Sequence, residues 1–481
     1  MSDLTDKTAT ELLALYASGQ ASPVEAVQDC FARIAAVDPA LNAVLTPLQE
    51  QALASAADSA DRWVKGTARP LEGVPYGLKD IVATAGIRTT GGSRLYEDHV
   101  PTADATLAAR LRNAGGVLVA KLHTFEFACG GAQNRTFGEC RNPWDLTRTT
   151  GGSSSGSGAA VAARMMPVAI GTDTGGSIRI PSSYCGLTGL KPTYGRVPRD
   201  GVMGMSWTMD HAGPMTRSAA DAALVLDVIA GASPGDPTSS ARPVPDHFAA
   251  VGASVAGRRV GRPRGWFEDR MHPAVGAAFE AALAQLEGTG VEVVDVELEE
   301  IDVIATASWA VIYAEMLSLH ADVAHLVEDR DSMGAGLLAA TPYVHAADYL
   351  KALRYRAVFQ QQLDAVMSAA GIDAFVTPAA TTTPPRLADM LVDTGDGLVD
   401  WLDVASRVTV PFNYSGSPAL VMPGALVDGM PTSIQLAGRP HQESTLLSLA
   451  GAFQSVTAHH LARPAEAPLH TPAPTTVGAT S

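Results

Sequence analysis

The chain has 481 residues, of which 46% are hydrophobic and 17% charged, and it carries a formal net charge of −16. A chain of this length and hydrophobic content can bury a large core, so we expect a globular protein. An acidic surface repels phosphate backbones. The composition therefore predicts no nucleic-acid partner.

Four cysteines are too few for a disulfide framework in a chain of this length, and Cys129 and Cys140 lack the close spacing of a zinc pair. The N-terminus has no basic region followed by an apolar run, and no stretch approaches the roughly 18–20 apolar residues of a membrane span. We therefore expect a cytoplasmic protein with no metal site and no membrane contact.

Residues 1–70 are predicted to be helical. Ser22-Pro23 has the pattern of a helix N-cap followed by proline at the first helical position. Apolar residues then follow on one helical face over residues 24–37, and a third helix is expected over residues 48–64.

From residue 71 onward, helices alternate with short apolar strands. An amphipathic helix is expected over residues 102–113, and buried strands are expected at 117–120 and 168–170. This alternation favours a mainly parallel sheet covered by helices on both faces.

The later half of the chain has weaker signals. Residues 301–399 are predicted to be mostly helical, without a readable motif. Strands are expected at 259–261, 291–298, 374–376, 419–422 and 433–436. We expect four regions: N-terminal helices at 1–70, a catalytic core at 71–235, the rest of the sheet at 236–462, and a disordered tail at 463–481. Substrate specificity is expected to reside around residues 300–400.

The richest segment is the glycine- and serine-rich block at residues 149–158. A flexible linker would sit at a composition boundary, and this block does not. A phosphate-binding loop would need Lys and then Ser or Thr after its last glycine, where Ala159-Ala160 stand instead. Residues 152–156 do match the G-x-S-x-G pattern of a nucleophile elbow, but the polar residues before them do not indicate a strand. The possible histidine partners of an elbow, His441, His459 and His460, have no special context.

A second block, residues 171–179, directly follows the apolar strand at 168–170. A Gly-Gly-Ser turn after a strand lets successive backbone N–H groups converge on one point, as in an oxyanion hole. Ser177 at its end would face that point as a nucleophile. Taken alone, the pattern also fits a tight glycine turn closed by a capping serine.

The third block, residues 73–80, places Lys79 among apolar residues just after a Pro/Gly turn. A buried lysine there would lose its charge and become a base. For any single lysine, however, an ordinary surface position is far more common.

Together, in this order, the three blocks resemble the amidase signature family. The resemblance covers about residues 71–230. The segments that also match are 181–186, 189–197, 210–217 and 435–440. It implies a single α/β/α domain with a central twisted mixed β-sheet covered by helices.

The resemblance also implies the catalytic roles. Ser177 would be the nucleophile, Ser153 the bridging serine after a cis peptide bond, and Lys79 the base. The backbone N–H groups of the oxyanion hole would be those of Thr174, Gly175, Gly176 and Ser177. Asp173 and Arg179 would brace this loop, and no cofactor or metal would be needed.

The substrate is less defined by the sequence. Phe127, Cys129, Met205 and Trp207, together with Phe125, Met203 and Met209, lie near the catalytic blocks and would line an apolar pocket. Core packing explains them about equally well. An apolar pocket would suit small-molecule amides, anilides or carbamates (urethanase activity), with esters cleaved as well.

The alternative function is a glutamine-hydrolysing subunit of a tRNA-dependent amidotransferase. By resemblance, such subunits carry a Gly-Tyr-Tyr-containing helix in the region that grips glutamine. The comparable segment here, residues 343–354, resembles ordinary amidases instead. The sequence therefore favours a free enzyme acting on a small molecule, with a homodimer as the default assembly.

Overall fold

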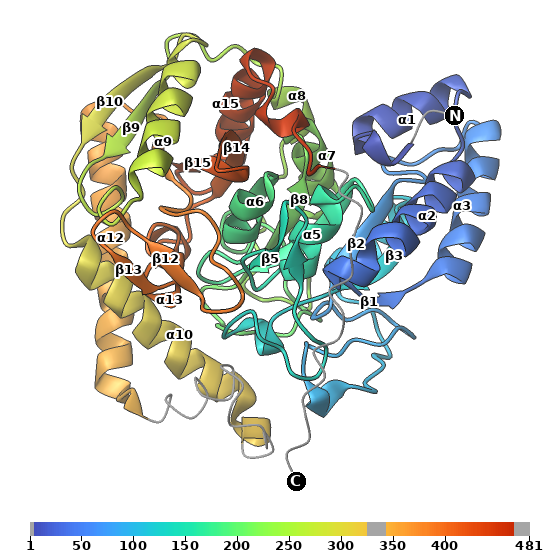
Figure 1. The fold of residues 1–481 in the computed structure, drawn as a ribbon, viewed down its shortest axis with the longest axis horizontal. Helices are drawn as coiled ribbons and strands as arrows, with labels where there is room; N and C mark the ends of the chain where they lie inside the picture. Colours follow the sequence, from blue (N-terminus) through green and yellow to red (C-terminus); the bar gives the residue numbers. More distant parts are fainter. Residues whose placement is uncertain (1–3, 325–342, 466–481) are drawn as a thin grey trace.

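The computed structural model describes residues 4–324 and 343–465, and within them eleven strands form one central sheet (Figure 1). The strand order is β1-β3-β2-β6-β8-β7-β14-β15-β11-β9-β10. In chain order the strands are β1 (Val44–Pro47), β2 (Pro75–Lys79), β3 (Val117–Leu122), β6 (Val168–Asp173), β7 (Thr188–Lys191), β8 (His211–Thr216), β9 (Arg259–Pro263), β10 (Glu292–Val296), β11 (Ala374–Pro378), β14 (Ala419–Val427) and β15 (Met430–Gly438). The tail for which we expect disorder lies outside the described residues from position 466 onward.

The sheet is mixed. β2 runs parallel to both β3 and β6, and β9 runs parallel to β10 and β11. Between these two groups, β8, β7, β14 and β15 pair antiparallel. The mixed sheet implied by the family resemblance is confirmed. The mainly parallel sheet expected from the alternation of elements is wrong, because hairpin-like pairs fill the middle of the sheet.

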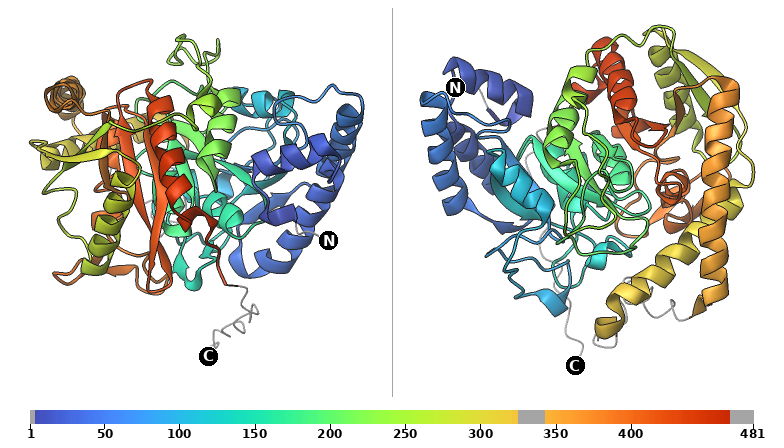
Figure 2. Two further views of the ribbon diagram at one scale, coloured as in Figure 1. Left: turned by 90° about the horizontal axis from the view of Figure 1, so that it is seen from above. Right: turned by 180° about the vertical axis from the view of Figure 1, so that it is seen from behind.

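Helices lie on both sides of this sheet (Figure 2). Their bounds are α1 (Ala9–Ser18), α2 (Pro23–Leu41), α3 (Gln49–Val64), α4 (Thr106–Asn113), α5 (Ser155–Ala162), α6 (Arg179–Cys185), α7 (Ala219–Ile229), α8 (His247–Ala250), α9 (Pro273–Glu287), α10 (Ile301–Ala324), α12 (Ala346–Ala370), α13 (Leu402–Ala405), α14 (Val410–Tyr414) and α15 (Glu443–Val456). Two short strand pairs stand outside the main sheet: β4 (Arg141–Asn142) with β5 (Asp145–Thr149), and β12 (Leu391–Asp393) with β13 (Leu398–Asp400).

The N-terminal helices begin where the sequence predicts. Ser22 caps α2 by accepting a hydrogen bond from the Glu25 N–H at 3.2 Å, and the Glu25 carboxylate accepts from the Ser22 N–H at 2.8 Å. This reciprocal pair satisfies N–H groups that have no partner inside the helix. Residues 1–70 are not wholly helical, however, because β1 pairs with β3 at one margin of the sheet.

The long helices α10 and α12 pack against each other at the margin of the molecule far from α1, α2 and α3 (Figure 1). Over Ile301–Val323, α10 is long and apolar enough to span a membrane by length and composition, with a mean hydropathy of 1.3 and 39% of the scored window buried. Core helices of globular proteins pass the same test. Here α10 also supplies walls to an internal cavity, which accounts for its apolar composition.

The order of the strands positions the candidate site. β2 ends at Lys79 and its parallel neighbour β6 ends at Asp173, so both strands release the chain at the same edge of the sheet. The turn after β6 leads directly into α6, and α5 begins just after the first glycine-serine block. Three segments that are distant in sequence therefore meet at one place.

Candidate active site

Lys79 is fully buried and lies against two hydroxyl groups. Its Nζ donates to Ser153 Oγ at 2.7 Å and to Thr172 Oγ1 at 2.8 Å. The peptide bond between Gly152 and Ser153 is cis, as the family resemblance implied. The structure thus brings together the lysine and the bridging serine predicted from separate blocks.

Burial lowers the pKa of Lys79 from 10.5 to about 7, against the opposing effect of the Asp173 and Asp210 carboxylates. Taking an ammonium group out of water disfavours its charged form. A substantial fraction of the molecules therefore carry an uncharged amine at this position near neutral pH.

Two further lysines, Lys121 and Lys191, are equally buried and were not singled out from the sequence. Lys121 donates to the Val82 carbonyl at 2.7 Å and lies 3.4 Å from the Asp80 carboxylate, and burial lowers its pKa to about 8. Lys191 donates to the carbonyl of Ser417. Burial alone therefore does not mark the base; the contact between Lys79 and Ser153 does.

Ser177 and Ser153 line the same cavity, which has a volume of about 400 Å³. Gly175 also lines it, in the turn between β6 and α6. None of the hydrogen bonds found in residues 4–324 and 343–465 uses the N–H of Thr174, Gly175, Gly176 or Ser177 as donor. The four backbone groups predicted for the oxyanion hole are thus available to bind an anion beside Ser177.

A buried polar network holds this turn. Both carboxylate oxygens of Asp173 accept from the Arg179 guanidinium at 3.0 Å, and Oδ2 also accepts from the Ile178 N–H at 3.2 Å. Arg179 donates onward to the side chain of Gln435 at 2.8 Å, and Asn413 donates to Asp173 at 2.7 Å. Burial by itself would raise the pKa of Asp173, but the Arg179 guanidinium and these hydrogen bonds hold it well below its usual range. Sequence patterns did not indicate Asn413 and Gln435, which come from the other half of the sheet.

The walls of the cavity agree only in part with the predicted pocket. Cys129 and Met205 line it, as does Phe125. Phe127 does not: its backbone has a φ of 51°, and its buried ring packs 4.9 Å from the His320 ring. Trp207 is 49% exposed and lies outside this cavity, with the Arg199 guanidinium 5.6 Å from its ring.

Residues that the sequence did not indicate form the rest of the wall. Trp309, Ile312 and Tyr313 of α10 line the cavity, and Trp401 and Ser406 approach it from the segment around α13. The rings of Trp309 and Tyr313 stack with centroids 5.5 Å apart and planes 30° apart. The lining is therefore largely aromatic and aliphatic.

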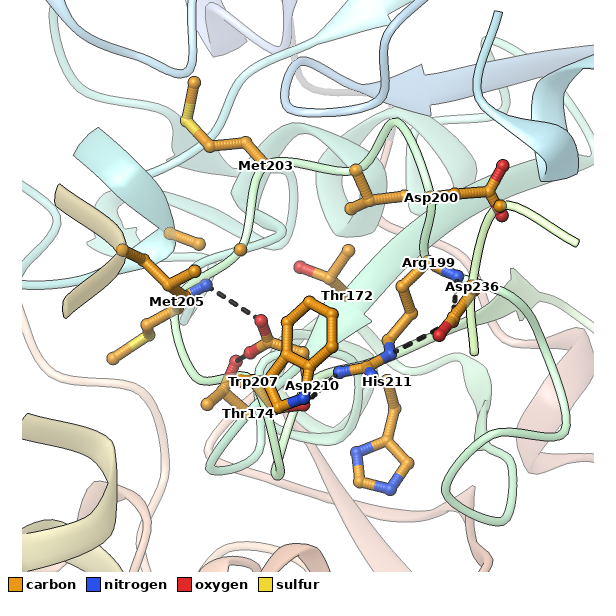
Figure 3. Close-up of a pocket in the computed structure, with 15 residues that line it drawn as sticks. Thr172, Thr174, Arg199, Asp200, Met203, Met205, Trp207, Asp210, His211 and Asp236 are labelled. Carbon is orange, nitrogen blue, oxygen red and sulfur yellow. Dashed lines mark hydrogen bonds and ion pairs between the residues drawn. The ribbon is translucent and has the colours of Figure 1, made fainter. Parts of the chain in front are cut away.

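A smaller cavity of about 120 Å³ adjoins the first and is shown in Figure 3. Met205 and Ala128 line both cavities and separate them. Thr172, whose hydroxyl accepts from Lys79, lines only the smaller one, together with Trp207 and the ion pair of Arg199 and Asp236. Trp207, predicted for the substrate pocket, therefore belongs to this neighbouring cavity.

The nucleophile-elbow interpretation gains no support from the structure. A strand, β5, does precede the glycine-serine block, contrary to our interpretation of those polar residues, but it pairs only with β4 outside the central sheet. His441, His459 and His460 do not line the cavity. In the described part of the chain, no group of three or more His, Cys, Asp or Glu residues is arranged to hold a metal.

The lowered pKa of Lys79 leads to a pH prediction. A lysine must be uncharged to accept a proton, so we expect kcat to rise through a pH of about 7 and to level off above pH 8, where only about a tenth of the base is still protonated. Initial rates at saturating substrate between pH 5 and 10 measure this. A continuing rise to pH 10 would contradict the shifted pKa, and a maximum below pH 6 would contradict a lysine base.

A buried amine beside a serine hydroxyl, with a second serine and available backbone donors around one cavity, defines a serine-hydrolase type of site on a mixed α/β sheet. The chain matches the family model Amidase over residues 25–447 and belongs to that family, whose members act on C–N bonds.

Two relatives carry names that make them a subunit of glutamyl-tRNA(Gln) amidotransferase. The protein from Moorella thermoacetica is 40% identical over 95% of this chain and 98% of its own length, and that from Geobacter sp. strain M21 is 38% identical over 95% and 99%. These names favour the alternative function over the free amidase.

Two solved structures share the fold. One, described as a vestigial protein complex that reveals the origins of an s-triazine catabolic enzyme, aligns with a TM-score of 0.89 and 32% identity over 95% of this chain and all of that chain. The other, a bacterial aryl acylamidase of the amidase signature family, gives a TM-score of 0.86 and 26% identity over 96% and 99%.

These comparisons correct one expectation. The sequence led us to expect a small-molecule substrate, no nucleic acid and at most a homodimer, but full-length relatives are named as subunits of an enzyme that acts on a charged tRNA, and a structural neighbour is a protein complex. That expectation is wrong because net charge describes the average surface. It does not describe one local face or the charge of a partner protein.

Proposed function

We propose that the chain hydrolyses carboxamides through an acyl-enzyme on Ser177. The observation that carries this proposal is the fully buried Lys79 amine, 2.7 Å from a serine hydroxyl that lines the same cavity as Ser177. A serine hydroxyl is a weak nucleophile and needs a neighbouring base.

The proposed reaction uses only groups of this chain and water. Uncharged Lys79 accepts the Ser153 proton while Ser153 accepts the proton of Ser177, whose oxygen attacks the carbonyl carbon. The N–H groups of residues 174–177 bind the oxyanion, each donor contributing about 3–4 kcal/mol in related sites. Ser153 then passes a proton to the leaving nitrogen as the C–N bond breaks. Water, deprotonated by the same path, releases the acid from Ser177.

The cavity walls support an amide with an aryl or apolar substituent. Phe125, Trp401 and the stacked pair of Trp309 and Tyr313 supply aromatic surfaces, and Ile312 adds an aliphatic one. Flat aromatic groups gain from offset or edge contacts with such rings beyond the burial of area. Carbamates and esters present the same carbonyl group to the same hydroxyl, so we propose them as further substrates.

The relatives support a second candidate, the glutamine-hydrolysing subunit of a tRNA-dependent amidotransferase, which would act with partner proteins and tRNA. Glutamine carries a carboxylate and an ammonium group, and burying either without a partner is costly. Asp403 lines the cavity and suits the ammonium group. Among the described residues that line it, none is a lysine, arginine or histidine that would suit the carboxylate.

A substrate panel separates the two candidates. We expect kcat/KM for a p-nitroanilide to exceed that for L-glutamine by at least about a hundredfold, since an unpaired buried carboxylate costs several kcal/mol. Anilide hydrolysis is followed at 405 nm and glutamine hydrolysis by ammonia release. A preference for glutamine, or glutamine turnover that appears only when a partner protein is added, would establish the second candidate instead.

A further inference from the structure

The segment from Met203 to Met209 forms the partition between the two cavities but belongs to no helix or strand. Met205, at its centre, lines both cavities. Asp210 accepts hydrogen bonds from the N–H groups of Met205 at 2.8 Å and Ser206 at 3.0 Å, which fixes one end of the segment (Figure 3). A loop without ladder hydrogen bonds depends on such side-chain contacts for its position.

Glu315 of α10 holds the other end of this segment. Its carboxylate accepts from the Ser206 hydroxyl at 2.5 Å, from the Thr208 N–H at 2.9 Å and from the Thr208 hydroxyl at 2.8 Å. Glu315 is only 5% exposed, and a buried carboxylate with several donors is both strongly bound and costly to remove.

The same carboxylate also ties down the second long helix. Tyr349 of α12 donates its hydroxyl to Glu315 at 2.9 Å, and Arg356 of α12 donates to the Thr208 carbonyl at 3.3 Å. One side chain therefore joins α10, α12 and the partition segment.

Glu315 lies one helical turn from the residues of α10 that face the catalytic cavity. Ile312 is three positions before it, and Trp309 and Tyr313 complete that wall. Residues three and four apart share a helix face, so a contact that fixes Glu315 also fixes the neighbouring wall residues. Met205 on the opposite side of the cavity is held through Ser206 and Thr208.

We propose that Glu315 is a positioning residue that sets the width of the catalytic cavity by holding the Met205 segment against α10, and so selects amides that carry an aryl group. The proposal rests on the proposed amide hydrolysis at Ser177. It adds to it the residue that determines which substituent the cavity accepts.

The test compares two amides of different size, propionamide and a naphthyl amide. In Glu315→Ala we expect kcat/KM for the naphthyl amide to fall by about 20-fold, mainly through KM, and that for propionamide to change less than about threefold. Glu315→Gln keeps the volume and one acceptor oxygen, so an intermediate loss is expected.

A matched pair of tyrosines supplies the control. Tyr349 and Tyr355 both lie on α12 and each donates its hydroxyl to a glutamate, Tyr349 to Glu315 and Tyr355 to Glu300. Only Glu315 contacts the partition segment. Tyr349→Phe should therefore shift the selectivity by about two- to fivefold, as should Thr208→Val, whereas Tyr355→Phe should not shift it. These mild variants carry the test if Glu315→Ala does not fold.

Equal losses toward both amides in the Glu315 variants, or no loss toward either, would overturn the positioning role. If the wild-type chain hydrolyses neither amide, it is the proposed function that fails. The labelling rates of Ser177 by an ethyl and a naphthyl fluorophosphonate then test Glu315 separately. The proposal requires the variants to slow the naphthyl probe selectively, and equal slowing would contradict it.

Discussion

Replacing Ser177 by alanine is expected to remove hydrolysis of amides, carbamates and esters together, with a fall in kcat of at least about a thousandfold. Every one of these reactions passes through a bond to the Ser177 oxygen, and no other side chain on the cavity wall offers an equivalent nucleophile next to available backbone donors. Turnover of a p-nitroanilide and of a p-nitrophenyl ester by the purified variant measures the loss.

Ser157→Ala is the matched control for this variant. Ser157 is a buried serine on α5 whose hydroxyl donates to the Ile170 carbonyl at 3.2 Å, and it does not line the cavity. It should lose about 1 kcal/mol of stability and keep most of its activity. More than a tenth of wild-type turnover in Ser177→Ala would contradict the assignment of the nucleophile.

Replacing Lys79 by alanine is expected to lower amide turnover by about a thousandfold and ester turnover by much less. The amine nitrogen is a poor leaving group that must receive a proton, which Lys79 supplies through Ser153, whereas an alkoxide or phenoxide leaves more readily. The ratio of amide to ester kcat in wild type and variant reports this difference directly.

Lys121→Met serves as the control for removing a buried lysine. Lys121 contacts Asp80 and the Val82 carbonyl but no cavity serine, so its loss leaves a buried carboxylate unpaired and should cost about 3–5 kcal/mol of folding stability. The amide-to-ester ratio of the molecules that remain folded should not change. If Lys79→Ala kept its amide turnover, or lost amide and ester turnover equally, Lys79 would not be the base.

The catalytic residues were predictable because each stands in a local pattern at the end of a strand. Lys79 ends β2 and the Gly-Gly-Ser turn follows β6, and both patterns are complete within ten residues of sequence. Parallel pairing of β2 with β6 then brings the two patterns together. Neither block alone was specific; the order and combination of three blocks was.

The substrate walls were not predictable for the opposite reason. Trp309, Ile312 and Tyr313 lie in a helix whose apolar residues have the spacing of ordinary core packing, and their place at the cavity depends on contacts with segments roughly a hundred residues away. Phe127 was misplaced because its side-chain direction follows from a backbone φ of 51°, which no local pattern indicated. Glu315 looks like any helical glutamate until α10 is packed against the partition segment.

The sheet shows the same division. Apolar runs predicted most of the strands, but the pairing of β7 with β8 and of β14 with β15 is antiparallel, which periodicity within each strand does not determine. β1 was missed because it is a short edge strand of four half-buried or exposed residues, with no apolar run to mark it.

The nucleophile is tested most directly by trapping the acyl-enzyme. The protein is mixed with excess p-nitrophenyl hexanoate, quenched in acid within one turnover, digested and examined by peptide mass spectrometry. The account predicts one hexanoyl group per chain, on the peptide that contains Ser177 and on that residue. Acylation of Ser153 or of any other residue instead, or full turnover with no acylated peptide, would contradict it.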